Sequence, residues 1–307
     1  MVQTPAAARP VASGLTLERL APGGKDGPDN VVRDSDQLCG GLWGQQWSLG
    51  RAEDPWRMQI PDIRMARNQF WPMHWHDCWI AVIVIDGSVL IGDWWMNPGD
   101  VLISPARVEY GPVLNGPKGC QLLEVFAQDV LSGGGYGPEF HDHPTLAHLQ
   151  TAKSGKAANF LPRPAGSEHN LGNQTTPLAG VAGVRTGKLQ GGQRWDLGEA
   201  ADPGRGVMLD TRLPASVSIP AHHHRDWRAL LLWNGSMRIG DVELTKDDLL
   251  IVEPGAEVPA AVTGAYGVHM TEFARTAAAV PTVFRGGDRE SAGYREGIAA
   301  TVDAEFE

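Results

Sequence analysis

The sequence repeats itself once, at a constant shift of 148 residues, and this duplication limits what the chain can fold into. The phrase HWHDCWIAVIVIDGSVLIGD begins at His74, and its counterpart HHHRDWRALLLWNGSMRIGD begins at His222. Upstream, GQQWSLGRAEDP from Gly44 matches GQRWDLGEAADP from Gly192 at the same shift and without a gap. A period of this length corresponds to a whole domain and not to the short unit of a solenoid. The chain is therefore interpreted as two copies of one domain.

Each copy has the pattern of short β-strands separated by turns. Histidine and apolar residues alternate from Met73 to Val84, DGS at residues 86–88 predicts a hairpin turn, and PGD at residues 98–100 predicts a second turn. The chain has 38 glycines and 22 prolines, and many of them fall between runs rich in Val, Ile and Leu. Several short strands with regularly spaced turns predict an all-β fold, either a closed antiparallel barrel or a jelly roll.

These motifs resemble the cupin superfamily, in which a strand with His-x-His is followed by a glycine, a PGD turn and a further strand. Two such units in one chain resemble a bicupin, which implies two cupin-type antiparallel β-barrels (jelly rolls) from an internal duplication. The resemblance says little about the reaction, because cupins include dioxygenases, decarboxylases, lyases, isomerases and storage proteins. The expected organisation is an N-terminal extension at 1–40, barrels at 41–130 and 189–285, an inter-barrel segment at 131–188 and a C-terminal tail at 286–307.

The chain departs from the pattern of metal-binding cupins at two positions of each copy. Such cupins usually have a glutamate shortly after His-x-His and a further histidine on a later strand. The late histidine position holds Tyr110 in the first copy and Val258 in the second. The glutamate position holds Ile80 or Ala81 in the first copy and Arg228 or Ala229 in the second.

A different histidine is predicted to complete the site of the second copy. If a hairpin turn is centred near Gly264, Val258 and His269 lie opposite each other on adjacent antiparallel strands, and directly opposed residues share a face. His269 would then join His222 and His224 in a set of three imidazoles inside the second barrel. Such a set suits Fe(II), Zn(II), Ni(II) or Cu(II) and leaves open positions for substrate or water.

The first copy has a poorer set of ligands by the same argument. Its paired histidines are His74 and His76, and the expected hairpin register places Gln121 opposite Tyr110. One reading puts the metal in the second barrel and leaves the first as a scaffold or an aromatic-lined pocket. The reverse assignment has the chemistry in the first barrel, with Tyr110 as acid or base.

Two charged residues of the second copy affect this prediction. Arg228 shares strand parity with the histidine pair and would repel a divalent ion unless Asp226, or a substrate carboxylate, compensates its charge. Glu272 lies three residues beyond His269 and is expected to face outward, away from the metal. Arg228 and Tyr110 are the candidate catalytic residues.

Composition restricts the partners. A net charge of −10 and a pI near 5.5 leave no basic face for a phosphate backbone or an anionic membrane, so neither nucleic acid nor membrane is an expected partner. Three cysteines without CxxC spacing favour a reducing compartment, and the first residues lack the apolar run of a signal peptide. We expect a cytoplasmic protein that binds a small molecule and forms a homodimer through its barrel faces.

The predicted function follows from the predicted ligands. Three neutral imidazoles on Fe(II) leave a cationic centre that can bind an enolate or phenolate, so an Fe(II) dioxygenase that cleaves a carbon-carbon bond of a dicarbonyl or phenolic substrate is favoured. One alternative is a non-redox lyase, hydrolase or isomerase with Zn or Ni as Lewis acid. Another is a non-catalytic binding or sensor cupin. Fe(II) is the favoured cofactor, with Zn, Ni, Cu or Mn as alternatives.

Overall fold

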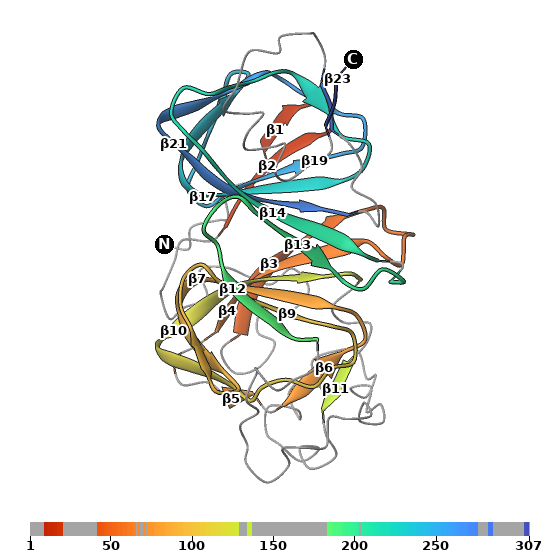
Figure 1. The fold of residues 1–307 in the computed structure, drawn as a ribbon, viewed down its shortest axis with the longest axis vertical. Coiled ribbons are helices and arrows are strands. Elements are labelled where there is room, and N and C mark those ends of the chain that lie inside the picture. The colour runs from red at the N-terminus through yellow and green to blue at the C-terminus, as the bar shows by residue number, and fades with distance from the viewer. Residues whose placement is uncertain are drawn as a thin grey trace. The chain divides into compact units, whose positions relative to one another are not determined.

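The structure is a computed structural model, and it describes residues 9–20, 42–65, 67, 70–71, 73–128, 134–136, 183–202, 204–275, 282–284 and 304–306. Regular structure in these ranges consists of strands, and no helix in them is long and apolar enough to cross a membrane. The chain divides into two compact units (Figure 1). Unit 1 consists of residues 1–3 and 21–188, and unit 2 of residues 4–20 and 189–307. The predicted all-β fold is confirmed.

Unit 1 is built on one large antiparallel sheet with the strand order β12-β9-β7-β10-β4-β3. Two short strands extend it, β5 against β10 and β8 against β7, while β6 and β11 form a separate pair. The bounds are β3 (Leu42–Leu49), β4 (Met58–Met65), β5 (Phe70–Trp71), β6 (His74–His76), β7 (Ile80–Ile91), β8 (Trp94–Met96), β9 (Asp100–Ser104), β10 (Val113–Phe126), β11 (Gly134–Tyr136) and β12 (Arg185–Lys188).

Unit 2 has the same plan, with the strand order β1-β2-β19-β17-β21-β14-β13. Strand β15 pairs with β21 and β18 with β17, while a second sheet has the order β20-β16-β22-β23. The bounds are β1 (Arg9–Ala12), β2 (Leu15–Arg19), β13 (Gln193–Leu197), β14 (Gly206–Leu213), β15 (Ser218–Ile219), β16 (His222–His223), β17 (Arg228–Ile239), β18 (Val242–Thr245), β19 (Asp248–Val252), β20 (Glu257–Val258), β21 (Ala261–Ala274), β22 (Thr282–Phe284) and β23 (Ala304–Phe306).

The duplication seen in the sequence is also a duplication of structure. Strands β4, β5, β7, β9 and β10 of unit 1 correspond to β14, β15, β17, β19 and β21 of unit 2, and both bounds of every pair differ by the same 148 residues. The paired histidines begin the equivalent strands β6 and β16. Differences between the units at equivalent positions are therefore differences of side chain on one common framework.

Two strands, β2 and β12, pair with the unit other than the one next to them in the sequence. Strand β2 precedes the first copy, yet it pairs with β19 of unit 2, where Leu17 lies opposite Leu250. Strand β12 precedes the second copy, yet it pairs with β9 of unit 1. The segments 1–40 and 131–188, expected to be an extension and a connection, thus supply strands to the two sheets. The repeat pattern did not predict this exchange.

Two turns predicted from glycines are bends within long strands. Residues 86–88 lie inside β7, and Gly264 lies inside β21. Gly87 has a φ of 73°, and a Cβ there would stand 2.2 Å from the carbonyl oxygen of Gly119, so a side chain cannot be accommodated. Pairing register shifts near these glycines, and such bulges bend a strand without ending it. The predicted hairpin around Gly264 is wrong, and so is the register that was based on it.

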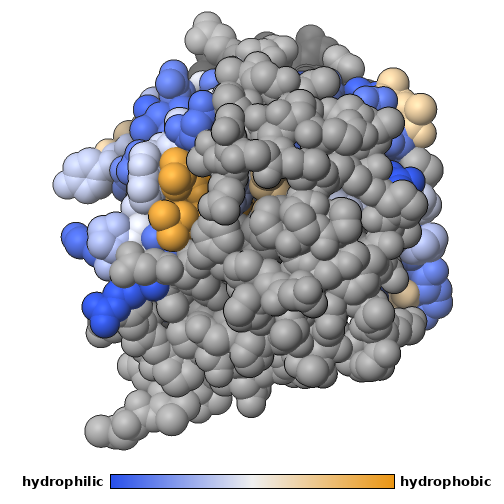
Figure 2. Space-filling view, turned by 90° about the horizontal axis from the view of Figure 1, so that it is seen from below, coloured by the Kyte–Doolittle hydropathy of each residue, from blue (hydrophilic) through white to orange (hydrophobic). Residues whose placement is uncertain are grey.

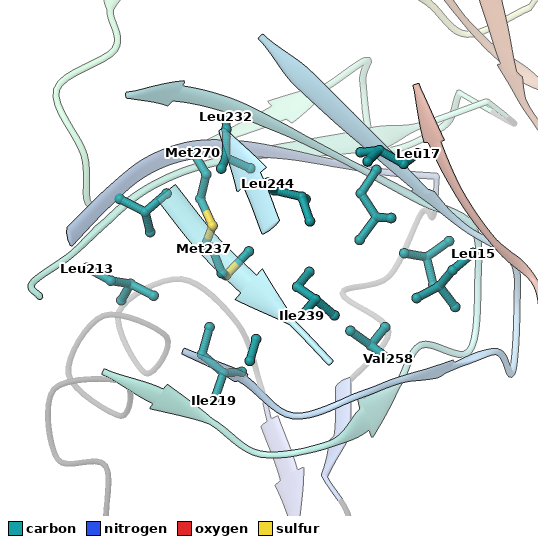
Figure 3. Close-up of a cluster of buried hydrophobic side chains, with 14 residues drawn as sticks. Leu15, Leu17, Leu213, Ile219, Leu232, Met237, Ile239, Leu244, Val258 and Met270 are labelled. Carbon is teal, nitrogen blue, oxygen red and sulfur yellow. The ribbon is translucent and has the colours of Figure 1, made fainter. Parts of the chain in front are cut away.

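A continuous buried core fills unit 2 (Figure 3). Its side chains come from the large sheet, including the N-terminal strand β2, and from β20 through Val258. Leu15 and Leu17 of β2 are 1% and 3% exposed, so this strand is part of the core and not an appendage. Val258 of β20 and Met270 of β21 also belong to this core, so the faces of β20 and β21 that carry these two residues are called inward below.

The outer surface of the described residues is mainly polar. On the face shown in Figure 2 most of their visible side chains are hydrophilic, with one strongly hydrophobic patch and a few paler hydrophobic spots. Among the described residues the exposed large hydrophobic side chains are Trp95, at 46%, and Tyr266, at 97%. Single exposed aromatics are ordinary on monomeric proteins, and the homodimer stays a prediction.

Candidate functional site

The histidine pair of unit 2 lies on the inward face of its strand. His222 on β16 is paired with Val258 on β20, and directly opposed residues share a face, here the face of the buried core. The rings of His222 and His224 meet edge to face, with centroids 5.0 Å apart and an interplanar angle of 85°. The Nδ1 of His222 lies 2.9 Å from the carbonyl oxygen of Pro220. If Nδ1 carries the proton and donates it to this carbonyl, the Nε2 lone pair is available to bind a metal ion.

Burial keeps both imidazoles of unit 2 neutral. The pKa of His222 is lowered to about 4, and desolvation by burial is the largest cause. The hydrogen bond to the Pro220 carbonyl opposes this shift, whereas electrostatic interactions with His223 and Arg228 contribute to it. Desolvation also lowers the pKa of His224 well below its usual value, helped by His222 and Arg228. At neutral pH the pair therefore consists of two uncharged nitrogen donors.

An ion pair with a buried arginine lies on the same inward face. Arg228 begins β17 opposite Ala274 of β21, and its Nη1 lies 3.2 Å from Oε1 of Glu272. Met270, two residues before Glu272 on the same face of β21, belongs to the core. The side chain of Arg228 is 3% exposed and that of Glu272 is 24% exposed. The prediction that Glu272 faces outward is therefore wrong, because its carboxylate is a counter-ion of Arg228.

His269 is turned away from this face. It alternates with Met270 along β21, so its ring projects to the other side of the strand. Its Nε2 lies 2.7 Å from Oδ1 of Asp210, a carboxylate that is fully buried and also accepts a hydrogen bond of 3.1 Å from the Thr271 hydroxyl. The observed strand pairing contradicts the predicted register, in which His269 would have reached His222.

Unit 1 places the same kind of polar pair at the equivalent position. Gln121 donates a 2.7 Å hydrogen bond from Nε2 to Oδ1 of Asp62. At the shift of 148 residues, Gln121 corresponds to His269 and Asp62 to Asp210. Gln121 does not lie opposite Tyr110, because its neighbours across the sheet are Arg64 and Asp86. The prediction of Gln121 beside the histidines of unit 1 depended on the same wrong hairpin.

The histidines of unit 1 converge on a tyrosine. The hydroxyl of Tyr110 lies 3.1 Å from Nε2 of His74 and 3.2 Å from Nε2 of His76. Tyr110 is 2% exposed and forms a β-bridge with His74, with mutual backbone hydrogen bonds of 3.1 and 3.0 Å. Phe126 packs edge to face on His76, with centroids 5.0 Å apart. The sequence analysis predicted Tyr110 as a candidate acid or base, but it did not predict that both imidazoles would face the Tyr110 hydroxyl.

The structure therefore brings together part of the predicted ligand set. It joins His222 with His224 near Arg228, and His74 with His76 and Tyr110. Within the described residues, no group of three or more His, Cys, Asp or Glu side chains is arranged to hold a metal ion. The donor set of unit 2 is two neutral imidazoles, which supply two coordination positions and leave the others to water or substrate.

Comparison with known proteins gives matches in structure alone. No protein-family model matches the sequence, and no curated protein does. A candidate dioxygenase from Nostoc punctiforme has 12% identity and a TM-score of 0.50, over 80% of this chain and 87% of that one. Oxalate decarboxylase from Bacillus subtilis has 13% identity and a TM-score of 0.47, over 81% and 75%. The coconut allergen cocosin has 10% identity and a TM-score of 0.48, over 84% and 86%.

Identities this low concern the fold and not the reaction. The tandem antiparallel units, the histidine pairs on equivalent strands and the likeness to the Nostoc protein agree with the resemblance seen in the sequence. The fold is the one that the resemblance to bicupins implies, two similar antiparallel β units in one chain, and it is similar to the fold of the Nostoc protein.

Proposed function

We propose that this protein is a metal-dependent bicupin enzyme that acts on a small organic anion in unit 2. The observation that carries the proposal is the neutral pair of His222 and His224 beside the buried guanidinium of Arg228. Two uncharged nitrogen donors favour a metal cation, and a buried arginine favours an anionic ligand. Their combination in one barrel interior fits an anion that is bound by a metal and by Arg228 together.

The chain's own residues fit a divalent metal at this pair. His222 and His224 would hold it through Nε2, since the Nδ1 of His222 faces the Pro220 carbonyl. A divalent metal acts as a Lewis acid when bound, and Fe(II), the favoured ion, also makes O2 chemistry available. Zn, Ni, Cu and Mn are alternatives with the same donors.

Arg228 would orient the substrate. Its guanidinium donates hydrogen bonds in a fixed planar fork, which matches a carboxylate, enolate or phenolate oxygen. Glu272 holds that guanidinium at 3.2 Å and reduces its repulsion of a cation at the histidines. The apolar core that includes Val258 and Met270 excludes water and strengthens the electrostatic interactions of Arg228.

The favoured reaction is the oxidative cleavage of a carbon-carbon bond in a dicarbonyl or phenolic substrate. Such substrates lose a proton to form an enolate or phenolate, and this anion is the form that both a metal and Arg228 stabilise. The Nostoc punctiforme protein of similar fold is named as a candidate dioxygenase, which agrees with this reaction class.

A second candidate is a non-redox lyase, hydrolase or isomerase, and one observation favours it. The Tyr110 hydroxyl stands between the Nε2 atoms of His74 and His76, at 3.1 and 3.2 Å, which is an arrangement suited to proton transfer. In this case unit 1 carries acid-base chemistry without O2. A protein that binds a small molecule without turnover is the remaining alternative.

Metal analysis with matched variants tests the proposal. The purified protein, loaded anaerobically with Fe(II) and desalted, should retain about one iron per chain. His224→Ala should lose it, whereas His223→Ala should keep it, because His223 pairs with Glu257 on the opposite face of β16. Oxygen uptake with a panel of β-dicarbonyls and catechols should then depend on His224 and Arg228. Iron retained in His224→Ala would contradict the proposed site, and turnover of the panel without O2 uptake would favour the non-redox alternative.

A further inference from the structure

The two units hold their histidine pairs in almost the same geometry. The ring centroids of His74 and His76 are 5.3 Å apart at 87°, and those of His222 and His224 are 5.0 Å apart at 85°. The backbone framework is the same too. The carbonyl of His76 accepts a 2.7 Å hydrogen bond from the amide of Arg107, and the carbonyl of His224 accepts one of 2.7 Å from the equivalent Gly255.

The residue that faces the pair from the opposite strand differs. Tyr110 is bridged to His74 in unit 1, and Val258 is paired with His222 in unit 2, at positions 148 residues apart. Both side chains point to the same face as the histidines, and both are buried, at 2% and 4% exposed. A phenol thus stands where the other unit has two methyl groups.

The Tyr110 hydroxyl lies where both imidazoles direct their Nε2 atoms. It is 3.1 Å from one Nε2 and 3.2 Å from the other, so the two nitrogens converge on one oxygen. A hydroxyl has a single proton, so it can donate to one imidazole and accept from the N–H of the other. A divalent metal would need both Nε2 lone pairs at about 2.0–2.1 Å, in the space that this oxygen occupies.

Tyr110 cannot easily leave this position. Two backbone hydrogen bonds tie it to His74, and its ring packs on the His74 ring with centroids 4.6 Å apart. A rotation of the side chain would have to displace buried neighbours, because interiors are close-packed. The two hydrogen bonds of the hydroxyl would also be lost.

We infer that Tyr110 keeps divalent metals out of unit 1, and that Val258 leaves the equivalent histidine pair of unit 2 open to one. Tyr110 is in this sense the residue that determines which of two similar barrels binds metal. The statement about unit 2 rests on the proposed function, whereas the statement about Tyr110 does not.

Reciprocal substitutions test the inference, because each unit provides the control for the other. Tyr110→Val introduces the residue of unit 2 into unit 1, and Val258→Tyr does the reverse. Each metal-free protein is loaded with Zn(II), desalted and measured by elemental analysis, with circular dichroism to verify folding. We expect one zinc per chain in the unmodified protein, two in Tyr110→Val and none in Val258→Tyr. The added zinc of Tyr110→Val should disappear in the double variant with His76→Ala.

The results separate the inference from the proposed function. If the unmodified protein binds no zinc but Tyr110→Val gains one that depends on His76, the inference holds for Tyr110 and the proposed function fails. Zinc unchanged in a folded Tyr110→Val overturns the inference. Zinc lost in that variant also overturns it, because Tyr110 would then be a ligand. If Val258→Tyr does not fold, the zinc content of Tyr110→Val and the zinc-dependent rise in the melting temperature of Tyr110→Val still test the inference.

Discussion

Arg228 and Glu272 form an ion pair of 3.2 Å on the inward face of unit 2, across neighbouring strands β17 and β21. Arg228 shares its face with the core, and its charge adds to desolvation by burial in lowering the pKa of both His222 and His224. The equivalent position in unit 1 is Ile80, whereas Glu272 has the counterpart Glu124. The second unit thus has a buried arginine where the first has an isoleucine, and this difference accompanies that between Val258 and Tyr110.

Removal of Glu272 should destabilise the protein more than removal of the whole pair. Glu272→Gln leaves the Arg228 charge buried with a neutral partner, and a loss of about 2–4 kcal/mol in the free energy of unfolding is expected. The double variant with Arg228→Met removes the uncompensated charge and should recover most of this loss. Urea unfolding of both variants measures the difference. A double variant less stable than Glu272→Gln would mean that Arg228 stabilises the fold by other contacts.

His269 should tolerate replacement by the residue of the other unit. His269→Gln can keep the hydrogen bond to Asp210, as Gln121 does to Asp62, so a change within about 1 kcal/mol is expected. His269→Ala leaves the buried Asp210 with one fewer donor and should cost about 1–3 kcal/mol. Thermal unfolding compares the two. Bound metal should be equal in His269→Gln and the unmodified protein, and a loss of metal there would restore His269 as a ligand.

Stability of the metal-free protein should fall as the pH is lowered through the range from about 6.5 to 4. The pKa of His222 is about 4 in the folded protein and near 6.5 when unfolded, so in this window the unfolded state binds more protons. Each such histidine then costs about 1.4 kcal/mol per pH unit, and the pKa of His224 shifts in the same direction. Urea unfolding at several pH values measures the slope. His222→Asn should flatten it, and an unchanged slope would assign the effect to other groups.

Strand β2 should be required for the stability of unit 2. Leu17→Ala removes buried atoms from the core opposite Leu250, and a loss of about 2–4 kcal/mol is expected. Thr16→Ala on the same strand is the matched control, because its side chain faces away from that core and is half-buried. Chemical unfolding of the two variants gives the comparison. Equal effects would indicate that β2 is not part of the cooperative core.

The sequence by itself determined the duplication, the all-β fold of two similar units and the residues that distinguish the copies. These features are local or periodic: a constant shift of 148 residues, alternation along strands, and the replacement of Tyr110 by Val258 at one aligned position. Because duplicated sequences adopt the same framework, the alignment placed Tyr110 and Val258 at equivalent positions of the two copies. That each of them lies opposite the first histidine of its pair was seen only in the structure.

Only the tertiary structure decided which face of β21 points to the histidine pair. A glycine within an apolar run can make a turn or a bulge, and the local sequence around Gly264 is compatible with both. Pairing with β14 and β17, far away in the sequence, selects the bulge and keeps β21 as one strand. Side chains alternate with a period of two, so this choice placed Glu272 on the face of the histidine pair and His269 on the opposite face, beside the buried Asp210. The assignment of β2 to unit 2 was decided in the same way, by a sheet edge that no local pattern encodes.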